Sequence, residues 1–166
     1  MKIIKSVGSK QTEIIQDILD LHNEGNPIDL DLTYSKGVFY KDGAVKEPKL
    51  KLDLTPQTED TIQGSSNNTP FDSESMSCIM FYPPFVIAGK TYKTNDENSS
   101  RIAKRFSAYE NYNQLKEHYA STLKECYRLL KDDGIVIMKL QNTVSSGKQH
   151  MTHYFTMQEA IKLGFY

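Results

Sequence analysis

The sequence contains only two cysteines and no hydrophobic stretch that approaches the length of a membrane span. Cys78 and Cys126 stand far apart, without a Cys-x-x-Cys pair or a Cys/His cluster. Buried thiols are therefore expected rather than a disulfide framework or a zinc site. A bilayer span needs about 20 apolar residues in succession, and the N-terminus does not resemble a signal peptide. These absences predict a cytoplasmic protein that holds no metal.

The chain also lacks an excess of charge of either sign. Its 20 basic and 21 acidic residues give a formal net charge of −1. Binding to nucleic acid would therefore need a local cluster of basic residues. Neither a Gly-x-Gly-x-x-Gly motif nor a complete phosphate-loop motif is present. Their absence argues against dinucleotide oxidoreductases and phosphate-loop hydrolases, which are the rival nucleotide-dependent α/β enzymes.

The 166 residues suit a single domain, residues 1–166, with a core of its own. Strand patterns occur at residues 28–32, 49–54, 62, 77–81 and 135–138, and helical patterns at 10–22, 107–130 and 156–164. Ser9, Ser107 and Thr156 are the expected N-terminal caps of these helices. A polar turn at 131–134 should separate the second helix from the last strand. Alternating strands and helices predict an open, mostly parallel α/β sheet.

The stretch from Cys78 to Phe85 is an apolar run that ends in two prolines and an aromatic residue. Proline donates no hydrogen bond to a sheet and has a restricted φ, so the backbone must leave the sheet here. A rigid carbonyl group beside the ring of Phe85 suits a planar, hydrogen-bonding group such as a nucleobase. The alternative interpretation is a strand that prolines stop before a surface loop.

Three features directly follow predicted strands: the turn at 33–37, the acid Asp53, and the pair Pro83-Pro84. In open parallel sheets, ligands bind outside the carboxyl ends of the strands. We therefore expect these three features to gather at one edge of the sheet.

The motifs Asp-Leu-Thr-Tyr-Ser-Lys-Gly-Val-Phe-Tyr (31–40), Phe-Tyr-Pro-Pro-Phe (81–85) and Lys-Leu-Gln-Asn-Thr-Val-Ser-Ser-Gly-Lys-Gln-His (139–150) occur in this order. Together they resemble the amino-directed DNA methyltransferases, which use S-adenosylmethionine to methylate N6 of adenine or N4 of cytosine. The likeness is to the phage and bacterial subgroup with an Asp-Pro-Pro-Phe motif, and it covers nearly the whole chain. It implies a Rossmann-like methyltransferase sheet, S-adenosylmethionine as cofactor and DNA as partner.

On the cofactor side, the resemblance implies that Asp31 accepts hydrogen bonds from the ammonium end of S-adenosylmethionine. Asp53 is placed to bind the ribose hydroxyls, as the acid of a dinucleotide fold does. Ser65 lies in the loop that touches the adenine in similar enzymes. The tight loop after the first strand contributes the remaining expected cofactor-binding residues, Thr33, Tyr34 and Gly37. Solvated carboxylates at strand ends are the alternative for Asp31 and Asp53.

On the target side, the resemblance implies catalytic roles for Tyr82, Pro83, Pro84 and Phe85. In the family, an Asp, Asn or Ser precedes the prolines, and its side chain and the first proline's carbonyl accept hydrogen bonds from the base's amino group. Phe85 would stack on that base. Tyr82 departs from this pattern, because a phenol oxygen is a weaker acceptor and lies further from its Cα. Because one such acceptor is lost, we expect the activation free energy of methyl transfer to be higher by about 3 kcal/mol or more.

For DNA phosphates, the candidate residues are Arg101, Lys104 and Arg105 after the proline pair, and Lys148 near the end of the chain. A solvated loop and a connecting loop are the respective alternatives. Family members continue past residues 164–166 with two further strands. The sheet is therefore expected to lack its C-terminal strands, and a second copy or another partner chain would cover the exposed edge.

A binding protein is the rival to an active methyltransferase. It would have the same fold and would bind the cofactor or DNA without turnover, for instance as a partner subunit.

Overall fold

The computed structural model describes residue 4, residues 7–88 and residues 108–166. The chain folds as two compact units. The first comprises Met1–Phe81 and Arg128–Met138, and the second comprises Tyr82–Tyr127 and Lys139–Tyr166.

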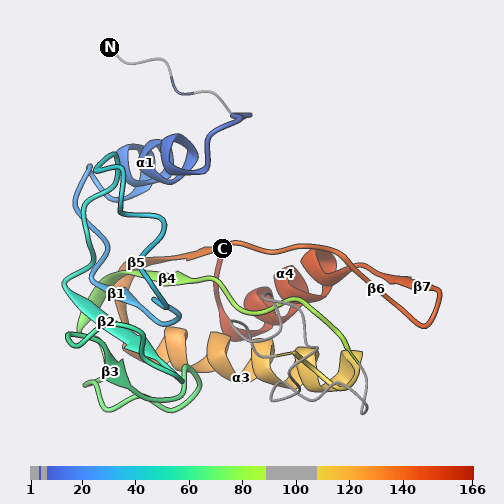
Figure 1. Cartoon of the computed structure of the whole chain (residues 1–166). Coiled ribbons are helices and arrows are strands. Elements are labelled where there is room, and N and C mark those ends of the chain that lie inside the picture. Colours follow the sequence, from blue (N-terminus) through green and yellow to red (C-terminus); the bar gives the residue numbers. More distant parts are fainter. Residues whose placement is uncertain (1–3, 5–6, 89–107) are drawn as a thin grey trace. The chain divides into compact units, whose positions relative to one another are not determined.

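The first unit contains a five-stranded sheet, whose strands are β1 (Leu30–Asp31), β2 (Leu50–Asp53), β3 (Ile62–Gln63), β4 (Met76–Phe81) and β5 (Leu130–Met138). Figure 1 shows them in the order β3-β2-β1-β4-β5, and every neighbouring pair is parallel. The predicted open, parallel α/β sheet is thus confirmed. Its strand order is consistent with a Rossmann-like fold.

The strands of the sheet coincide with apolar segments of the sequence. β4 lies between β1 and β5 and is buried at five of its six positions, as expected for a strand covered on both faces. In β2, Leu52 is buried between the half-buried Lys51 and Asp53. β1 is shorter than predicted, but the N–H groups of Asp29 and Leu32 still donate to carbonyls of β4.

The predicted turn at 131–134 is present inside β5 rather than before it. Leu130 pairs with Met76, whereas Ile135 pairs with Cys78, so residues 131–134 lie opposite a single residue of β4. Asp133 adopts a φ of 61° in this bulge. An irregularity of this kind lets a strand begin, turn and resume pairing.

Helix α1 (Gln11–His22) belongs to the first unit and buries Ile15 and Leu19. The residue at its N-cap is Lys10, which forms no side-chain cap, so the expected cap at Ser9 was wrong. In the second unit, α3 (Tyr112–Leu129) buries Leu115, Tyr119, Leu123 and Cys126, which are four of the six residues of the apolar stripe that the sequence predicts. The other two differ, because Tyr112 is half-buried and Leu130 is the first residue of β5. The last two residues of α3 lie in the first unit.

The caps of the other two helices also differ from the predictions. The carboxamide of Asn111 accepts hydrogen bonds from the N–H groups of Asn113 and Gln114 at the start of α3. The predicted cap Ser107 lies outside the described residues. Helix α4 (Thr152–Leu163) begins four residues before Thr156, whose hydroxyl instead donates to the carbonyl of Thr152. It ends at Gly164, as predicted.

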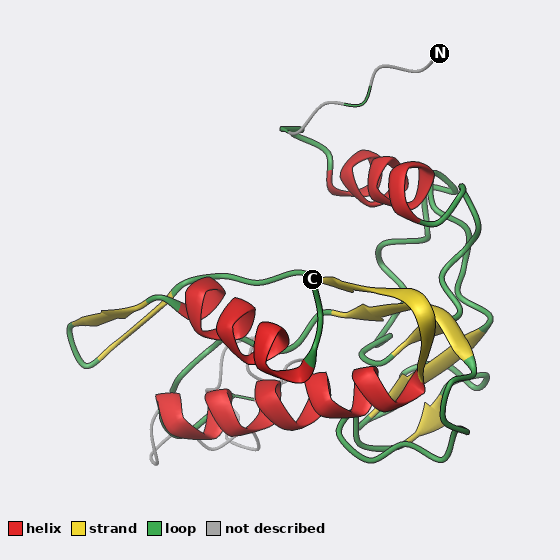
Figure 2. Ribbon diagram, turned by 180° about the vertical axis from the view of Figure 1, so that it is seen from behind, coloured by secondary structure: helices red, strands yellow, loops and turns green. Residues whose placement is uncertain are grey.

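A two-stranded antiparallel hairpin precedes α4 in the second unit. Its strands are β6 (Thr143–Ser145) and β7 (Lys148–His150). Ser146 and Gly147 have φ values of 51° and 70°, as the two-residue turn of a tight hairpin requires. The connecting loop considered for this segment is therefore an ordered ribbon. Figure 2 shows it extending beyond the ends of α3 and α4.

Candidate ligand site at the carboxyl edge of the sheet

The strands of a parallel sheet end at the same edge, and here that edge begins with a buried acid. Asp31, the last residue of β1, is 1% exposed. Its Oδ1 accepts a 2.9 Å hydrogen bond from the N–H of Thr33, and its Oδ2 accepts a 2.7 Å bond from the hydroxyl of Tyr40. Burial raises the pKa of Asp31 to about 6, although these two donors favour its ionised form.

Asp53, the last residue of β2, ties the loop after β1 to the neighbouring strand. Its Oδ2 accepts a 2.8 Å bond from the N–H of Ser35, and its Oδ1 accepts a 2.8 Å bond from the N–H of Thr55. The N–H of Tyr34 donates to the carbonyl of Leu52 in the same connection. The two strand-end acids therefore belong to one hydrogen-bonded arrangement.

The site carries excess negative charge. The charge of Asp53 contributes to the raised pKa of Asp31, so the two carboxylates lie within electrostatic range of each other. Within residues 7–88 and 108–166, no lysine or arginine forms an ion pair with either acid. Lys51 on β2 pairs with Glu47 and Asp60 instead. Such an arrangement favours a cationic ligand group or one rich in hydroxyl donors.

Tyr34 and Gly37 determine the conformation of the loop that follows β1. Tyr34 is buried, donates from its hydroxyl to Glu47 at 3.1 Å, and stacks on Tyr40 with ring centroids 5.7 Å apart. Gly37 has a φ of 61°, and a Cβ there would lie 2.3 Å from the Tyr34 hydroxyl. The close approach that Gly37 permits is thus to Tyr34.

The loop that contains Ser65 is attached to the same edge. The N–H of Gly64 donates to the carbonyl of Asp53 at 3.0 Å. Ser65 donates from its hydroxyl to the side chain of Asn67 at 2.7 Å and forms a backbone bridge with Asn68. All six predicted cofactor-binding residues therefore lie in the first unit, on segments joined by hydrogen bonds: Asp31, Thr33, Tyr34, Gly37, Asp53 and Ser65.

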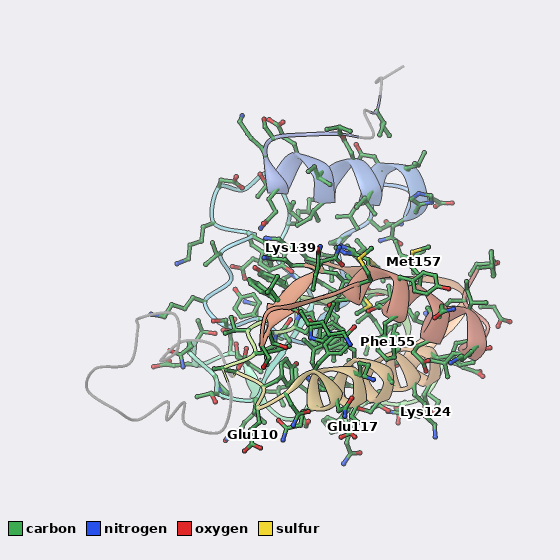
Figure 3. The ribbon with its side chains drawn as sticks, turned by 90° about the vertical axis from the view of Figure 1, so that its right-hand side faces the viewer. Glu110, Glu117, Lys124, Lys139, Phe155 and Met157 are labelled. Carbon is green, nitrogen blue, oxygen red and sulfur yellow. The ribbon has the colours of Figure 1, made fainter. Side chains whose placement is uncertain are left out.

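The proline pair opens the second unit, directly after Phe81 ends β4. Tyr82 and Phe85 are half-buried, and their rings stack at 24° with centroids 6.5 Å apart. The Nζ of Lys139 lies 4.4 Å from the centre of the Tyr82 ring. Figure 3 labels Lys139, the first residue after β5. A cation therefore lies over the aromatic ring of Tyr82.

The backbone of the proline pair is held from α3. The hydroxyl of Tyr119, which is fully buried, donates a 2.8 Å hydrogen bond to the carbonyl of Pro84. Pro83 is buried, and its carbonyl has no hydrogen-bond partner among the described residues. One of the two proline carbonyls thus accepts a hydrogen bond, while the other lies on a buried residue without a described donor.

The predicted phosphate contacts divide into two groups. Arg101, Lys104 and Arg105 lie outside the described residues. Lys148 is exposed at the start of β7.

The sequence analysis gave no individual role to four residues of these arrangements: Ser35, Tyr40, Tyr119 and Lys139. Lys139 follows an apolar strand, so its position at the carboxyl edge was a usable signal. Nothing in the local pattern distinguishes Tyr40 or Tyr119 from other packed aromatics.

Three further findings limit the chemistry of the described part of the chain. No described helix is long and apolar enough to cross a membrane. No group of three or more His, Cys, Asp or Glu among residues 7–88 and 108–166 is arranged to hold a metal ion. Cys78 and Cys126 are free, buried thiols, as expected, and burial raises the pKa of each to about 12.

Comparison with models of protein families finds no match to this sequence, and comparison with curated proteins finds none either.

Proposed function

We propose that this chain is an S-adenosylmethionine-dependent DNA methyltransferase of the amino-directed type, with the cofactor bound at the carboxyl ends of β1 and β2. The parallel strand order and the acids that end both strands support the proposal. The motif resemblance over residues 31–40, 81–85 and 139–150 supplies the reaction class.

The observation that carries the proposal is that Asp31 and Asp53 lie within electrostatic range of each other and neither has a described cationic partner. S-adenosylmethionine has a sulfonium and an ammonium group, together with two ribose hydroxyls. Asp31 would attract the cationic methionine end, which would also lower the pKa of Asp31. Asp53, half-buried and more accessible, would accept hydrogen bonds from the ribose.

Methyl transfer would then be direct. S-adenosylmethionine would supply the methyl group to the exocyclic nitrogen of the base, and that nitrogen would lose a proton to solvent. The carbonyl of Pro83, which has no hydrogen-bond donor among the described residues, would accept a hydrogen bond from the amino group and orient its lone pair. Phe85 would stack on the base.

Binding without turnover is a second candidate function, favoured by one observation. The Tyr82 ring lies under Lys139 and against Phe85, at the position where the family has a compact acceptor. A protein of this kind would bind the cofactor and methylate slowly or not at all.

Isothermal titration with S-adenosylmethionine and S-adenosylhomocysteine tests the cofactor site. We expect Asp53→Asn to weaken binding at least tenfold, because a neutral amide replaces one carboxylate. Asp72→Asn is the matched control, since Asp72 is an exposed acid of the same unit, and it should bind like the wild type. Absence of wild-type binding would refute the proposal.

Transfer of a radiolabelled methyl group to duplex DNA separates the two candidate functions. Tyr82→Asp restores a carboxylate acceptor and should raise the transfer rate about 100-fold, by analogy with one oxyanion-hole contact. Cofactor binding without transfer in both proteins would support the binding function instead.

A further inference from the structure

We propose that the β6–β7 hairpin enters the major groove of duplex DNA and reads an A·T base pair through Val144 and Gln149. The inference rests on the proposed function, because it assumes that the substrate is DNA. It concerns a different surface from the cofactor site, so the two can be tested separately.

The two faces of the hairpin differ: one packs against the protein and the other is exposed. Thr143 pairs with His150, and Val144 pairs with Gln149. Directly opposed residues share a face, and successive residues alternate between faces. Thr143 is buried, whereas Val144 is 68% exposed and Gln149 is exposed. Val144 and Gln149 therefore form the outward face.

His150, which lies on the inward face with its partner Thr143, attaches the hairpin to α3. Its ring stacks on Tyr112 of α3 with centroids 4.0 Å apart at 20°, and its Nε2 lies 2.9 Å from the Ser145 hydroxyl. An isolated two-stranded hairpin is marginally stable in water, so such an anchor is needed to hold a projecting ribbon in one orientation. Both ribbon views show the hairpin reaching past α3 and α4 (Figures 1 and 2).

The charge around the hairpin suits DNA. The sequence from Gly134 to Gln158 contains no aspartate or glutamate, although acids outnumber bases in the whole chain, 21 to 20. Lys148 occupies the strand end next to the turn, and no described acid forms an ion pair with it. A lysine at the end of a ribbon can contact a phosphate beside the groove that the ribbon enters.

The chemistry of the outward face specifies which base pair. The major groove of B-form DNA admits a two-stranded ribbon, and a glutamine there can bind adenine N6 and N7 together. An apolar side chain beside it can contact the methyl group of thymine. Val144 and Gln149 supply these two groups side by side. A-form RNA has a deep, narrow major groove that side chains do not read, so it is a discriminating control.

The test uses the full chain and a fluorescein-labelled duplex DNA pool with a randomised centre. Anisotropy should show binding to the pool, and selection by the wild type should enrich an A·T pair at one position. Gln149→Ala should lose this preference, with affinity for the selected duplex about tenfold lower. Lys148→Ala should weaken binding to all duplexes and reduce the slope of log K against log salt by about 1.

Two variants control for structure and charge. Lys124→Ala removes an exposed lysine of α3, labelled in Figure 3, and should leave binding unchanged. Ser146→Asn places Asn-Gly at the turn, which favours the observed hairpin, and should keep or improve binding.

Several outcomes would overturn the inference: no duplex binding by the wild type, Gln149→Ala and Lys148→Ala variants that bind like the wild type, or equal affinity for an RNA duplex of the same sequence. Titration of S-adenosylmethionine into the hairpin variants should give wild-type affinity. Loss of cofactor binding in the wild type would instead refute the proposed function.

Discussion

The hydroxyl of Tyr40 donates a 2.7 Å hydrogen bond to Oδ2 of Asp31, and both side chains are buried. The contact lets a carboxylate remain inside the protein at the end of β1. It also holds the loop at 33–40 against the strand that it leaves, because the N–H of Thr33 binds the other oxygen of the same carboxylate. A charged group and the conformation of the loop thus depend on each other.

Replacing Tyr40 with phenylalanine should reduce the free energy of unfolding by about 1–3 kcal/mol at neutral pH, because one buried carboxylate oxygen loses its donor. Urea denaturation followed by circular dichroism measures this change. Tyr154→Phe is the control, since Tyr154 is exposed and its hydroxyl accepts a bond from Gln158. Equal midpoints for Tyr40→Phe and the wild type would contradict the role assigned to this bond.

The raised pKa of Asp31 predicts a specific pH dependence of stability. The native carboxyl titrates at about 6 against an ordinary value of 3.8, chiefly because of burial. The native state therefore binds more protons than the unfolded state between these values. The contribution of Asp31 is fully present below pH 4 and is lost as the pH rises through 6, by about 3 kcal/mol in total.

Asp31→Asn should remove this component, because the amide does not titrate. The difference in unfolding free energy between wild type and Asp31→Asn should therefore shift in favour of the variant between pH 4 and pH 7. Denaturation curves at several pH values within this window measure it. A constant difference across the window would show that Asp31 titrates normally.

Cofactor affinity should also depend on the titration of Asp31, but it should rise with pH where stability falls. A cationic ligand prefers the ionised form of Asp31, so S-adenosylmethionine should bind about tenfold more weakly at pH 5 than at pH 7.5. Isothermal titration at both pH values provides the measurement. Asp31→Asn should bind with little dependence on pH, and a pH-independent wild type would argue against contact between the ligand and Asp31.

Alanine at Gly37 should destabilise the protein by more than alanine at Gly43. Both glycines have a positive φ, 61° and 73°, so both substitutions carry backbone strain of about 1 kcal/mol or more. At Gly37 the new Cβ would also meet the Tyr34 hydroxyl at 2.3 Å, whereas at Gly43 nothing lies within 4 Å. Comparing the thermal unfolding of the two variants isolates the destabilisation that this contact causes. Equal losses of stability in both variants would show that the contact has no effect.

Elements with a strong local pattern could be predicted from the sequence. The apolar run of β4 and most of the stripe on α3 bury the side chains that their periodicity indicates. In the segment of β2, Leu52 is buried, whereas Leu50 is half-buried and Leu54 is 60% exposed. The positions of Asp31 and Asp53 at strand ends were visible for the same reason. A residue's place within a periodic segment depends on its neighbours in the chain, and these are known before folding.

Prediction from local sequence was wrong or incomplete where the same residues are compatible with more than one local structure. Thr156 and Glu159 match a capping box, yet α4 begins at Thr152 and Thr156 lies inside the helix. The Ser-Gly turn at 146–147 is short enough for a hairpin, but its flanking residues are polar and carry little strand pattern. The ring of His150 stacked on Tyr112 helps to hold that ribbon in place.

By itself, the sequence determined which segments become parallel strands and which residues end them, because apolar periodicity and the position of polar residues act over short distances. Only the tertiary structure decided what each strand-end group contacts. Tyr40 reaches Asp31 across nine residues, and Tyr119 reaches the carbonyl of Pro84 across 35. Such pairs form only after the chain has folded, since their geometry depends on register and packing that no local pattern contains.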